Sequence, residues 1–290
     1  MSWRTVVVSS NAKLDYQLGF LVVRARDTKK VSLSEIHTLI IESTAVSLTA
    51  ALLSELTKKK IKVIFCDEKR NPLSELVAFY GAHDTSAKVR NQIAWSDNVK
   101  AAVWTEIVTE KIRKQAEHLE SIKHAEARML FDYIKEIEFG DSSNREGHAA
   151  KVYFNSLFGK DFTRTAENSI NAALNYGYGL ILSTVNREVV LNGYITQLGL
   201  FHDNMFNQFN LSSDLMEPFR ALVDRKVRLL MPVKFEHEEK VIMLGLLQQE
   251  VVIAGRKELV PNAIKIYVRS VFDALNEKDV SLIKFYQDEL

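Results

Sequence analysis

A carboxylate occupies an unusual position in the segment NREGHAAKVYFNSLFG, residues 144–159. The segment has apolar groups at helical spacing, and residues at i, i+4, i+7 and i+11 of a helix lie on one face. Counted from Glu146, the later positions on that face are Ala150, Tyr153 and Leu157. Glu146 therefore stands at the head of an apolar stripe that should face the core, where an ionised group needs a partner.

A histidine and a second glutamate could supply the rest of such a site. His202 ends the apolar segment 194–202, where the polar loop 203–213 begins, and Glu217 directly precedes Pro218. Since proline is tolerated only in the first turn of a helix, Glu217 is expected at or near a helix start. Two carboxylates and one imidazole suit Mg²⁺ or Mn²⁺, and such an ion can polarise a phosphoryl oxygen.

The same residues also have a purely structural interpretation. Ser143 to Glu146 and Asp214 to Glu217 both have the spacing of a capping box, in which the glutamate bonds back to the start of its own helix. A capping role predicts exposed, ionised glutamates, whereas Glu146 lies on the apolar stripe. The spacing alone leaves the metal site and the helix caps as alternatives.

Two arginines stand beside the glutamates. Arg145 and Arg220 are candidates for holding a DNA phosphodiester by paired hydrogen bonds, although either is equally consistent with a surface ion pair. Tyr176 and Tyr178 could stack on bases, but packing is the more common role for tyrosines in a helical domain. His148 follows Glu146 by two positions and should face away from it.

Composition excludes several other chemistries. The 290 residues carry a net charge of +1 and one cysteine, so the chain has no intramolecular disulfide and no thiolate zinc cluster. The sequence contains no phosphate-binding loop, no H-E-x-x-H and no G-x-S-x-G motif. Cys66 lies in an apolar run and is expected to be buried. No stretch suits a membrane span, and a cytoplasmic, reducing setting is expected.

The pattern divides the chain into a small β-rich domain, 1–80, and a larger all-α domain, 81–290, which makes an α+β fold. The first domain is expected to hold a helix capped by Ser47 and short strands rich in β-branched and aromatic residues. The expected strands are Arg4–Ser9, Leu14–Gln17, Phe20–Arg24, Lys30–Leu33, Thr38–Ile41, Val63–Cys66 and Leu76–Phe79.

The second domain shows helical periodicity throughout. Residues 100–137 contain neither Gly nor Pro and predict one long helix, which ends at the Gly140-Asp-Ser-Ser143 break. The helix that begins near Glu146 follows, then one or more helices through 165–200 and others from about residue 215. This domain contains all three candidate ligands.

Four ordered motifs resemble one known family. They are Asn144-Arg-Glu-Gly-His-Ala-Ala150 with Tyr153-Phe154, Asn171-Ala-Ala-Leu-Asn-Tyr-Gly-Tyr178, Gly199-Leu-Phe-His202, and Asp214-Leu-Met-Glu-Pro-Phe-Arg220. In this combination the chain resembles the CRISPR-associated integrase of the spacer-acquisition machinery over nearly its whole length. Trp3-Arg-Thr-Val-Val-Val8 and Ile64-Phe-Cys-Asp67 look most like the variant of type II systems.

The resemblance implies a β-rich domain that dimerises and a helical catalytic domain. It implies that Glu146, His202 and Glu217 bind Mg²⁺ or Mn²⁺. It also implies the reaction, in which the 3′-hydroxyl of a short DNA fragment attacks a phosphodiester of a CRISPR repeat. The implied partners are double-stranded DNA, a second copy of the chain and a small second CRISPR-associated protein, all in the cytoplasm of a prokaryote.

Two rival functions remain open on the sequence. A metal-dependent nuclease or branched-DNA resolvase would use the same residues, with water in place of the 3′-hydroxyl. A non-catalytic DNA-binding scaffold would use the two glutamates only as helix caps. Chelation of metal would abolish activity in either enzyme and leave a scaffold unaffected.

Overall fold

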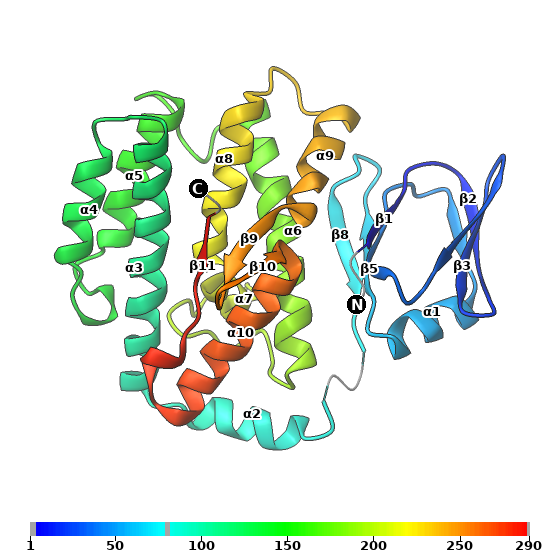
Figure 1. Ribbon diagram of the computed structural model, residues 1–290, viewed down its shortest axis with the longest axis horizontal. Coiled ribbons are helices and arrows are strands. Elements are labelled where there is room, and N and C mark those ends of the chain that lie inside the picture. The colour runs from blue at the N-terminus through cyan, green and yellow to red at the C-terminus, as the bar shows by residue number, and fades with distance from the viewer. Residues whose placement is uncertain (1–3, 79–81, 289–290) are drawn as a thin grey trace. The chain divides into compact units, whose positions relative to one another are not determined.

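A computed structural model of the chain describes residues 4–78 and 82–288 (Figure 1). The chain forms two compact units, Met1–Phe79 and Tyr80–Leu290. The domain boundary expected at residues 80–81, like Trp3 of the N-terminal motif and the end of the expected strand at Phe79, lies outside the described residues.

The N-terminal unit contains two four-stranded sheets. The first has the order β1 (Arg4–Val8), β5 (Ile36–Ile41), β7 (Lys62–Cys66) and β8 (Pro72–Leu76). Its first three strands are parallel, and β7 and β8 form an antiparallel pair. Every residue of β5 is buried, as expected for a central strand of a parallel sheet.

The second sheet has the order β4 (Thr28–Ser32), β3 (Phe20–Arg24), β2 (Ala12–Gln17) and β6 (Val46–Leu48). Helix α1 (Ala50–Lys58) follows β6. Both sheets and α1 contribute to one apolar core, which includes Leu14, Leu39 and Leu56. Cys66 is buried, as predicted.

Two details of this unit differ from the sequence prediction. Ser47 lies in β6, and Thr49 is the N-cap of α1, with its hydroxyl accepting a hydrogen bond from the Leu52 amide at 3.3 Å. The strand expected to begin at Leu76 instead begins at Pro72 and ends at Leu76, because the turn before it is complete at Asn71. Asp67 closes that turn by accepting a hydrogen bond from the Asn71 amide at 2.7 Å.

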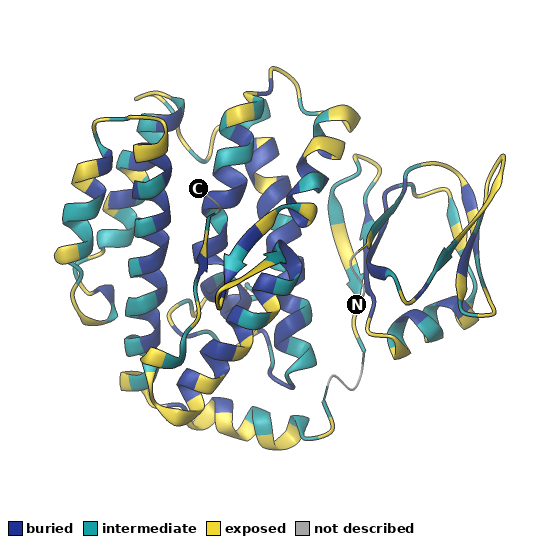
Figure 2. Ribbon diagram, viewed as in Figure 1, coloured by how far each residue is buried: buried dark blue, intermediate teal, exposed yellow. Residues whose placement is uncertain are grey.

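The C-terminal unit is built around three long helices, α3 (Asp97–Ser121), α6 (Ser169–Leu191) and α10 (Val260–Glu277). Their inward faces are buried (Figure 2). Shorter helices pack around them: α2 (Thr85–Ala94), α4 (Ala127–Lys135), α5 (Arg145–Phe158), α7 (Asn210–Leu215), α8 (Arg220–Leu230) and α9 (His237–Leu244). In the described residues no helix is long and apolar enough to cross a membrane.

The predicted helix 100–137 is in fact two helices, α3 and α4. The Lys123 amide bonds to the Glu120 carbonyl and the His124 amide to the Leu119 carbonyl, both at 2.8 Å, and Lys123 has φ +57°. This is a Schellman motif with lysine in the position that glycine usually occupies. The sequence therefore carried no visible stop signal.

The prediction of an all-α second unit also missed a small sheet. Its strands are β10 (Arg256–Leu259), β9 (Glu250–Ile253) and β11 (Tyr286–Gln287), in that spatial order. The fold remains α+β, with a β-rich unit followed by a mainly helical one.

Candidate active site

Glu146 lies in the first turn of α5, and another residue caps that helix. The carboxylate of Asp141 accepts hydrogen bonds from the backbone amides of Arg145 and Glu146, at 2.8 and 3.1 Å. The Glu146 side chain is thus released from any capping role and bonds to the ammonium of Lys111. Farther along the predicted inward stripe, Tyr153 and Leu157 are buried.

Glu217 begins the short 3₁₀ helix η2 (Glu217–Phe219), with Pro218 in its first turn as predicted. Its side chain is only 4% exposed and contacts two cations. The Arg220 guanidinium lies 2.9 Å from Oε1, and the Lys111 ammonium contacts Oε2. Glu217 is therefore a buried carboxylate with its charge compensated inside the protein.

Lys111 brings the two glutamates together, and sequence reasoning missed it. It lies in the middle of α3 and its single ammonium contacts both Glu146 and Glu217. Trp104, seven residues earlier, lies on the same face of α3 and is 1% exposed. A lysine within the buried face of a helix was the available signal, because such a residue needs a charged partner.

His202 is held in place by a buried carboxylate, that of Asp214 in α7. The imidazole Nδ1 bonds to Oδ1 of Asp214, which is itself wholly buried. Asp214 also accepts hydrogen bonds from the amides of Leu200, Phe201 and His202, at 2.6, 3.1 and 3.2 Å. Since an ionised carboxylate can only accept, the neutral ring carries its proton on Nδ1 and donates it to Asp214, which leaves Nε2 as the unprotonated nitrogen.

Close packing around Asp214 depends on Gly199. A Cβ atom at this position would lie 2.3 Å from the His202 carbonyl oxygen and 2.8 Å from Oδ2 of Asp214. Glycine is therefore required for the chain to fold over the carboxylate. The His202 ring also meets Trp104 edge to face, with ring centroids 5.8 Å apart.

The charges of the site act on one another. Hydrogen bonding to Asp214 raises the pKa of His202 against the effect of burial, and Glu217 and Glu146 raise it further. Burial opposes ionisation of Glu217, but Arg220 and Lys111 outweigh it and lower the pKa of that carboxyl. Burial would lower the pKa of the Lys111 ammonium, yet the two glutamates leave it raised. The electrostatic coupling links all three sequence-predicted ligands.

The capping-box interpretation of both glutamates is wrong. Asn144, not Ser143, is the N-cap of α5, and its side chain makes no capping hydrogen bond. Asp214 bonds to residues 200–202 rather than to the start of η2. Neither glutamate side chain bonds back to its own helix start, so both are available for another purpose.

The two candidate arginines have different surroundings. Arg220 contacts Glu217 and lies over the Tyr178 ring, 4.8 Å from its centroid. Arg145 instead pairs with Glu136 at 3.1 Å and lies over the Tyr133 ring. Tyr176 and Tyr178 are buried, in keeping with a packing role, and His148 is exposed. Of the two arginines, only Arg220 belongs to the site.

The donor atoms suit a divalent cation, although the arrangement includes a competing charge. In residues 4–78 and 82–288, no three His, Cys, Asp or Glu side chains are grouped as a metal site. The Lys111 ammonium lies between the two carboxylates instead. Two carboxylates that converge on one cation, beside an imidazole with Nε2 free, fit the oxygen-rich preference of Mg²⁺ and Mn²⁺.

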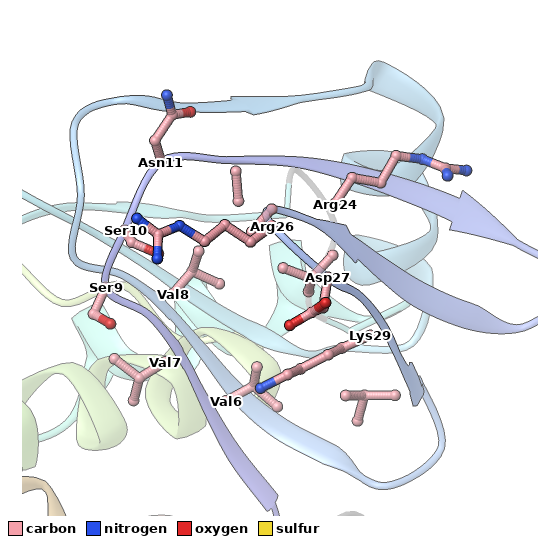
Figure 3. Close-up of a pocket in the computed structure, with 14 residues that line it drawn as sticks. Val6, Val7, Val8, Ser9, Ser10, Asn11, Arg24, Arg26, Asp27 and Lys29 are labelled. Atoms are coloured by element: carbon pink, nitrogen blue, oxygen red, sulfur yellow. The ribbon is translucent and has the colours of Figure 1, made fainter.

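A separate open pocket lies in the N-terminal unit and contains none of the predicted site residues. Figure 3 shows Ser9, Ser10 and Asn11 after β1, and Arg26 and Asp27 between β3 and β4, around its rim. Valines of the strands line its inner part. Its exposed charges are of both signs, and no chemistry of the Glu146–His202–Glu217 kind is present there.

Comparison with known proteins identifies the family. The family model described as "CRISPR associated protein Cas1" matches residues 5–244. This chain belongs to the Cas1 family. A CRISPR-associated endonuclease Cas1 of Neisseria meningitidis serogroup C (strain 8013) is 35% identical over 229 residues, 78% of this chain and 75% of the relative. The predicted family is thereby confirmed.

More distant Cas1 proteins agree. One from Francisella tularensis subsp. novicida (strain U112), also named an endonuclease, is 28% identical over 74% of each chain. The solved structure of a CAS1 protein from Thermotoga maritima has a TM-score of 0.73 at 17% identity, over 94% of this chain and 97% of that one. The expected α+β fold is confirmed.

Two further structures share the fold. A casposase bound to an integration product has a TM-score of 0.77 at 17% identity, over 96% of this chain and 91% of that chain. A Cas6-RT-Cas1–Cas2 complex contains a chain with a TM-score of 0.73 at 18% identity. This Cas1-family protein matches over 99% of its own length and spans 36% of that larger chain.

Proposed function

We propose that this protein is a metal-dependent DNA integrase and endonuclease that inserts short foreign DNA fragments into a CRISPR array. The observation that carries the proposal is the convergence of Glu146 and Glu217, from separate elements, on one cation beside His202. The relatives named as endonucleases and the fold shared with a casposase support a DNA strand-breaking and strand-joining activity.

The proposed reaction is a transesterification. The 3′-hydroxyl oxygen of the fragment attacks the phosphorus of a repeat phosphodiester, and the bond to the departing 3′ oxygen breaks. The proton of the attacking hydroxyl ends on the departing oxygen after transfer through a base or water. One P–O bond replaces another, so no nucleotide cofactor is consumed.

The chain's own residues orient the reacting groups. A bound Mg²⁺ or Mn²⁺ would supply positive charge to the phosphoryl oxygens and acidify the attacking hydroxyl. Glu146 and Glu217 provide the carboxylate oxygens that would hold it, and His202 provides Nε2. Asp214 fixes the tautomer and the orientation of the imidazole, as carboxylates commonly do for ligating histidines.

The proposed partners follow from the two ends of the inserted fragment. One active site joins one end, so insertion of both ends requires two competent subunits, and we propose at least a homodimer. A small second CRISPR-associated protein is proposed to complete the assembly. Support comes from the shared fold with a chain of a complex that contains Cas2. Double-stranded fragment and repeat DNA are the proposed substrates.

A metal-dependent nuclease or branched-DNA resolvase is the enzymatic alternative, because water could replace the 3′-hydroxyl at the same site. A non-catalytic DNA scaffold is less well supported. Its structural basis was that the glutamates are helix caps, and neither makes such a bond.

The reaction can be tested by strand transfer. A labelled duplex with free 3′-hydroxyls is incubated with a supercoiled repeat plasmid and the protein plus its small partner, in Mn²⁺ or EDTA. Integration predicts relaxed plasmid joined to label, lost in EDTA. Metal-dependent nicking without joining would favour the nuclease, and DNA binding with no metal-dependent product would favour the scaffold.

A further inference from the structure

The strongest unassigned feature of the site is the ammonium of Lys111. Its side chain is 8% exposed, and it contacts the carboxylates of both Glu146 and Glu217. These are the oxygens that the proposed metal would need. A monovalent cation of the protein itself therefore lies at the point where the two carboxylates offer the most favourable site for positive charge.

Without Lys111 the carboxylates would repel each other. Glu217 is almost wholly buried and Glu146 is partly buried, and uncompensated charges in such positions are costly. Arg220 compensates Glu217 from its other oxygen, whereas Glu146 forms its ion pair with Lys111. Lys111 thus ties α5 and η2 to α3 in the metal-free protein.

We infer that Lys111 is a built-in counter-ion that assembles the two carboxylates and is displaced when a divalent cation binds. This inference rests on the proposed metal-dependent function of the same site. A divalent ion and the ammonium cannot share the same oxygens at close range, because like charges only a few ångströms apart repel strongly. The lysine side chain is flexible and carries its charge at its end, which suits a counter-ion that is displaced.

Two opposite effects follow for a variant that lacks the charge. The metal-free protein loses the cation that links its carboxylates and becomes less stable. The divalent ion no longer has to displace a competitor and binds more tightly. A lysine with a purely structural role predicts only the first effect, and a lysine that assists binding of the ion predicts weaker binding.

Lys114 provides a matched control on the same helix. It is also buried and is paired with two glutamates, Glu110 at 3.5 Å and Glu117 at 2.8 Å. Neither of these glutamates belongs to the proposed metal set. The variant Lys114→Met therefore removes a buried, doubly paired lysine from α3 without a change at Glu146 or Glu217.

The experiment measures Mn²⁺ binding by calorimetry and thermal unfolding in EDTA, on the intact wild type, Lys111→Met and Lys114→Met. Methionine keeps a similar length without the charge. For Lys111→Met we expect Mn²⁺ affinity at least tenfold higher and a Tm in EDTA lower by about 5 °C or more. Lys114→Met should lose stability with Mn²⁺ affinity unchanged. Lys111→Gln replaces the methionine variant if the latter does not fold.

The outcomes separate this inference from the proposed function. Mn²⁺ binding that is equal to or weaker than wild type in the Lys111 variants would overturn the inference and leave the metal site standing. Absence of Mn²⁺ binding in every protein would overturn the proposed metal site, and the inference with it. Binding in the Lys111 variants alone would support the displacement in its strongest form.

Discussion

Asp214 accepts a hydrogen bond from the imidazole Nδ1 of His202. The same carboxylate also accepts hydrogen bonds from the three backbone amides of residues 200–202. This wholly buried carboxylate therefore accepts four hydrogen bonds and fixes both the chain at residues 200–202 and the His202 ring. Nε2 lies on the opposite side of the ring from Asp214, and within residues 4–78 and 82–288 it has no hydrogen-bond partner. The proposed metal chemistry depends on this arrangement as much as on the ligands themselves.

The first prediction is that Asp214→Asn lowers the strand-transfer rate by about 10- to 100-fold, the usual cost of losing the partner of a ligating histidine. An amide cannot accept all four hydrogen bonds, so the ring loses its fixed tautomer. The assay is joining of labelled duplex to plasmid. Asp203→Asn, at an exposed position beside His202, is the control and should be unchanged. Equal rates for both variants would contradict the positioning role.

The second prediction concerns the close approach of Gly199. Gly199→Ala should destabilise the protein by about 1–3 kcal/mol and greatly reduce joining, because its Cβ would displace the His202 carbonyl or Asp214. Gly245→Ala is the comparison, since its nearest neighbour is the flexible end of Lys226 at 3.3 Å. Chemical denaturation and the joining assay measure both effects. A Gly199→Ala protein with normal activity would show that the hydrogen bonds between Asp214 and residues 200–202 are not needed for joining.

The third prediction tests the two arginines. Arg220→Lys removes the guanidinium that lies against Glu217 and Tyr178, and joining should fall about tenfold because lysine cannot reproduce that geometry. Arg145→Lys should change the rate less than twofold, since its partner Glu136 is 50% exposed and such pairs contribute little. A larger loss in Arg145→Lys than in Arg220→Lys would instead assign Arg145 to DNA binding.

The fourth prediction is a pH effect on stability. Burial raises the pKa of Asp224 from 3.8 to about 6, against the opposing effects of Tyr178 and Arg220. A carboxyl with a raised folded-state pKa favours folding below its unfolded pKa, and that contribution is lost as pH rises through the folded value. The full contribution is about 3 kcal/mol, of which roughly half is lost between pH 5 and pH 8.

Asp224→Asn cannot titrate and isolates this effect. The free energy of unfolding of the wild type should therefore fall relative to that of Asp224→Asn as the pH rises from 5 to 8. Urea denaturation of both proteins at each pH gives the difference. Parallel stability curves would show that Asp224 keeps an ordinary pKa in the folded protein.

The sequence drew attention to the candidate ligands more readily than to the residues that hold them. Glu146 stood out by its place on an apolar stripe and Glu217 by the proline after it, but these local signals left a helix cap as the alternative, and the assignment as metal ligands came from the family resemblance. Asp214 was interpreted as a helix cap because a spacing of three residues is all that the sequence displays. Its actual partners lie 12 to 14 residues earlier, brought close by a turn through Gly199. The role of Lys111 depends on how α3, α5 and η2 pack together, and the periodicity of α3 alone does not reveal its two partners.

The helices and strands were likewise predicted only where local sequence determines them. The strands of the N-terminal unit were visible from β-branched residues, whereas the end of α3 was not, because Lys123 adopts the left-handed conformation without a glycine. The strands β9, β10 and β11 are two to four residues long and lie beside strong helical patterns. Such short strands are defined by their partners and not by their own sequence.

The most direct test of the metal site is a crystal structure of the protein grown with Mn²⁺ and measured at the manganese absorption edge. The predicted result is one strong anomalous peak within about 2.0–2.4 Å of carboxylate oxygens of Glu146 and Glu217 and of Nε2 of His202. The peak should be absent in Glu146→Gln crystals. No peak at these residues in the wild type, with Mn²⁺ bound elsewhere and strand transfer active, would contradict the assignment of the active site.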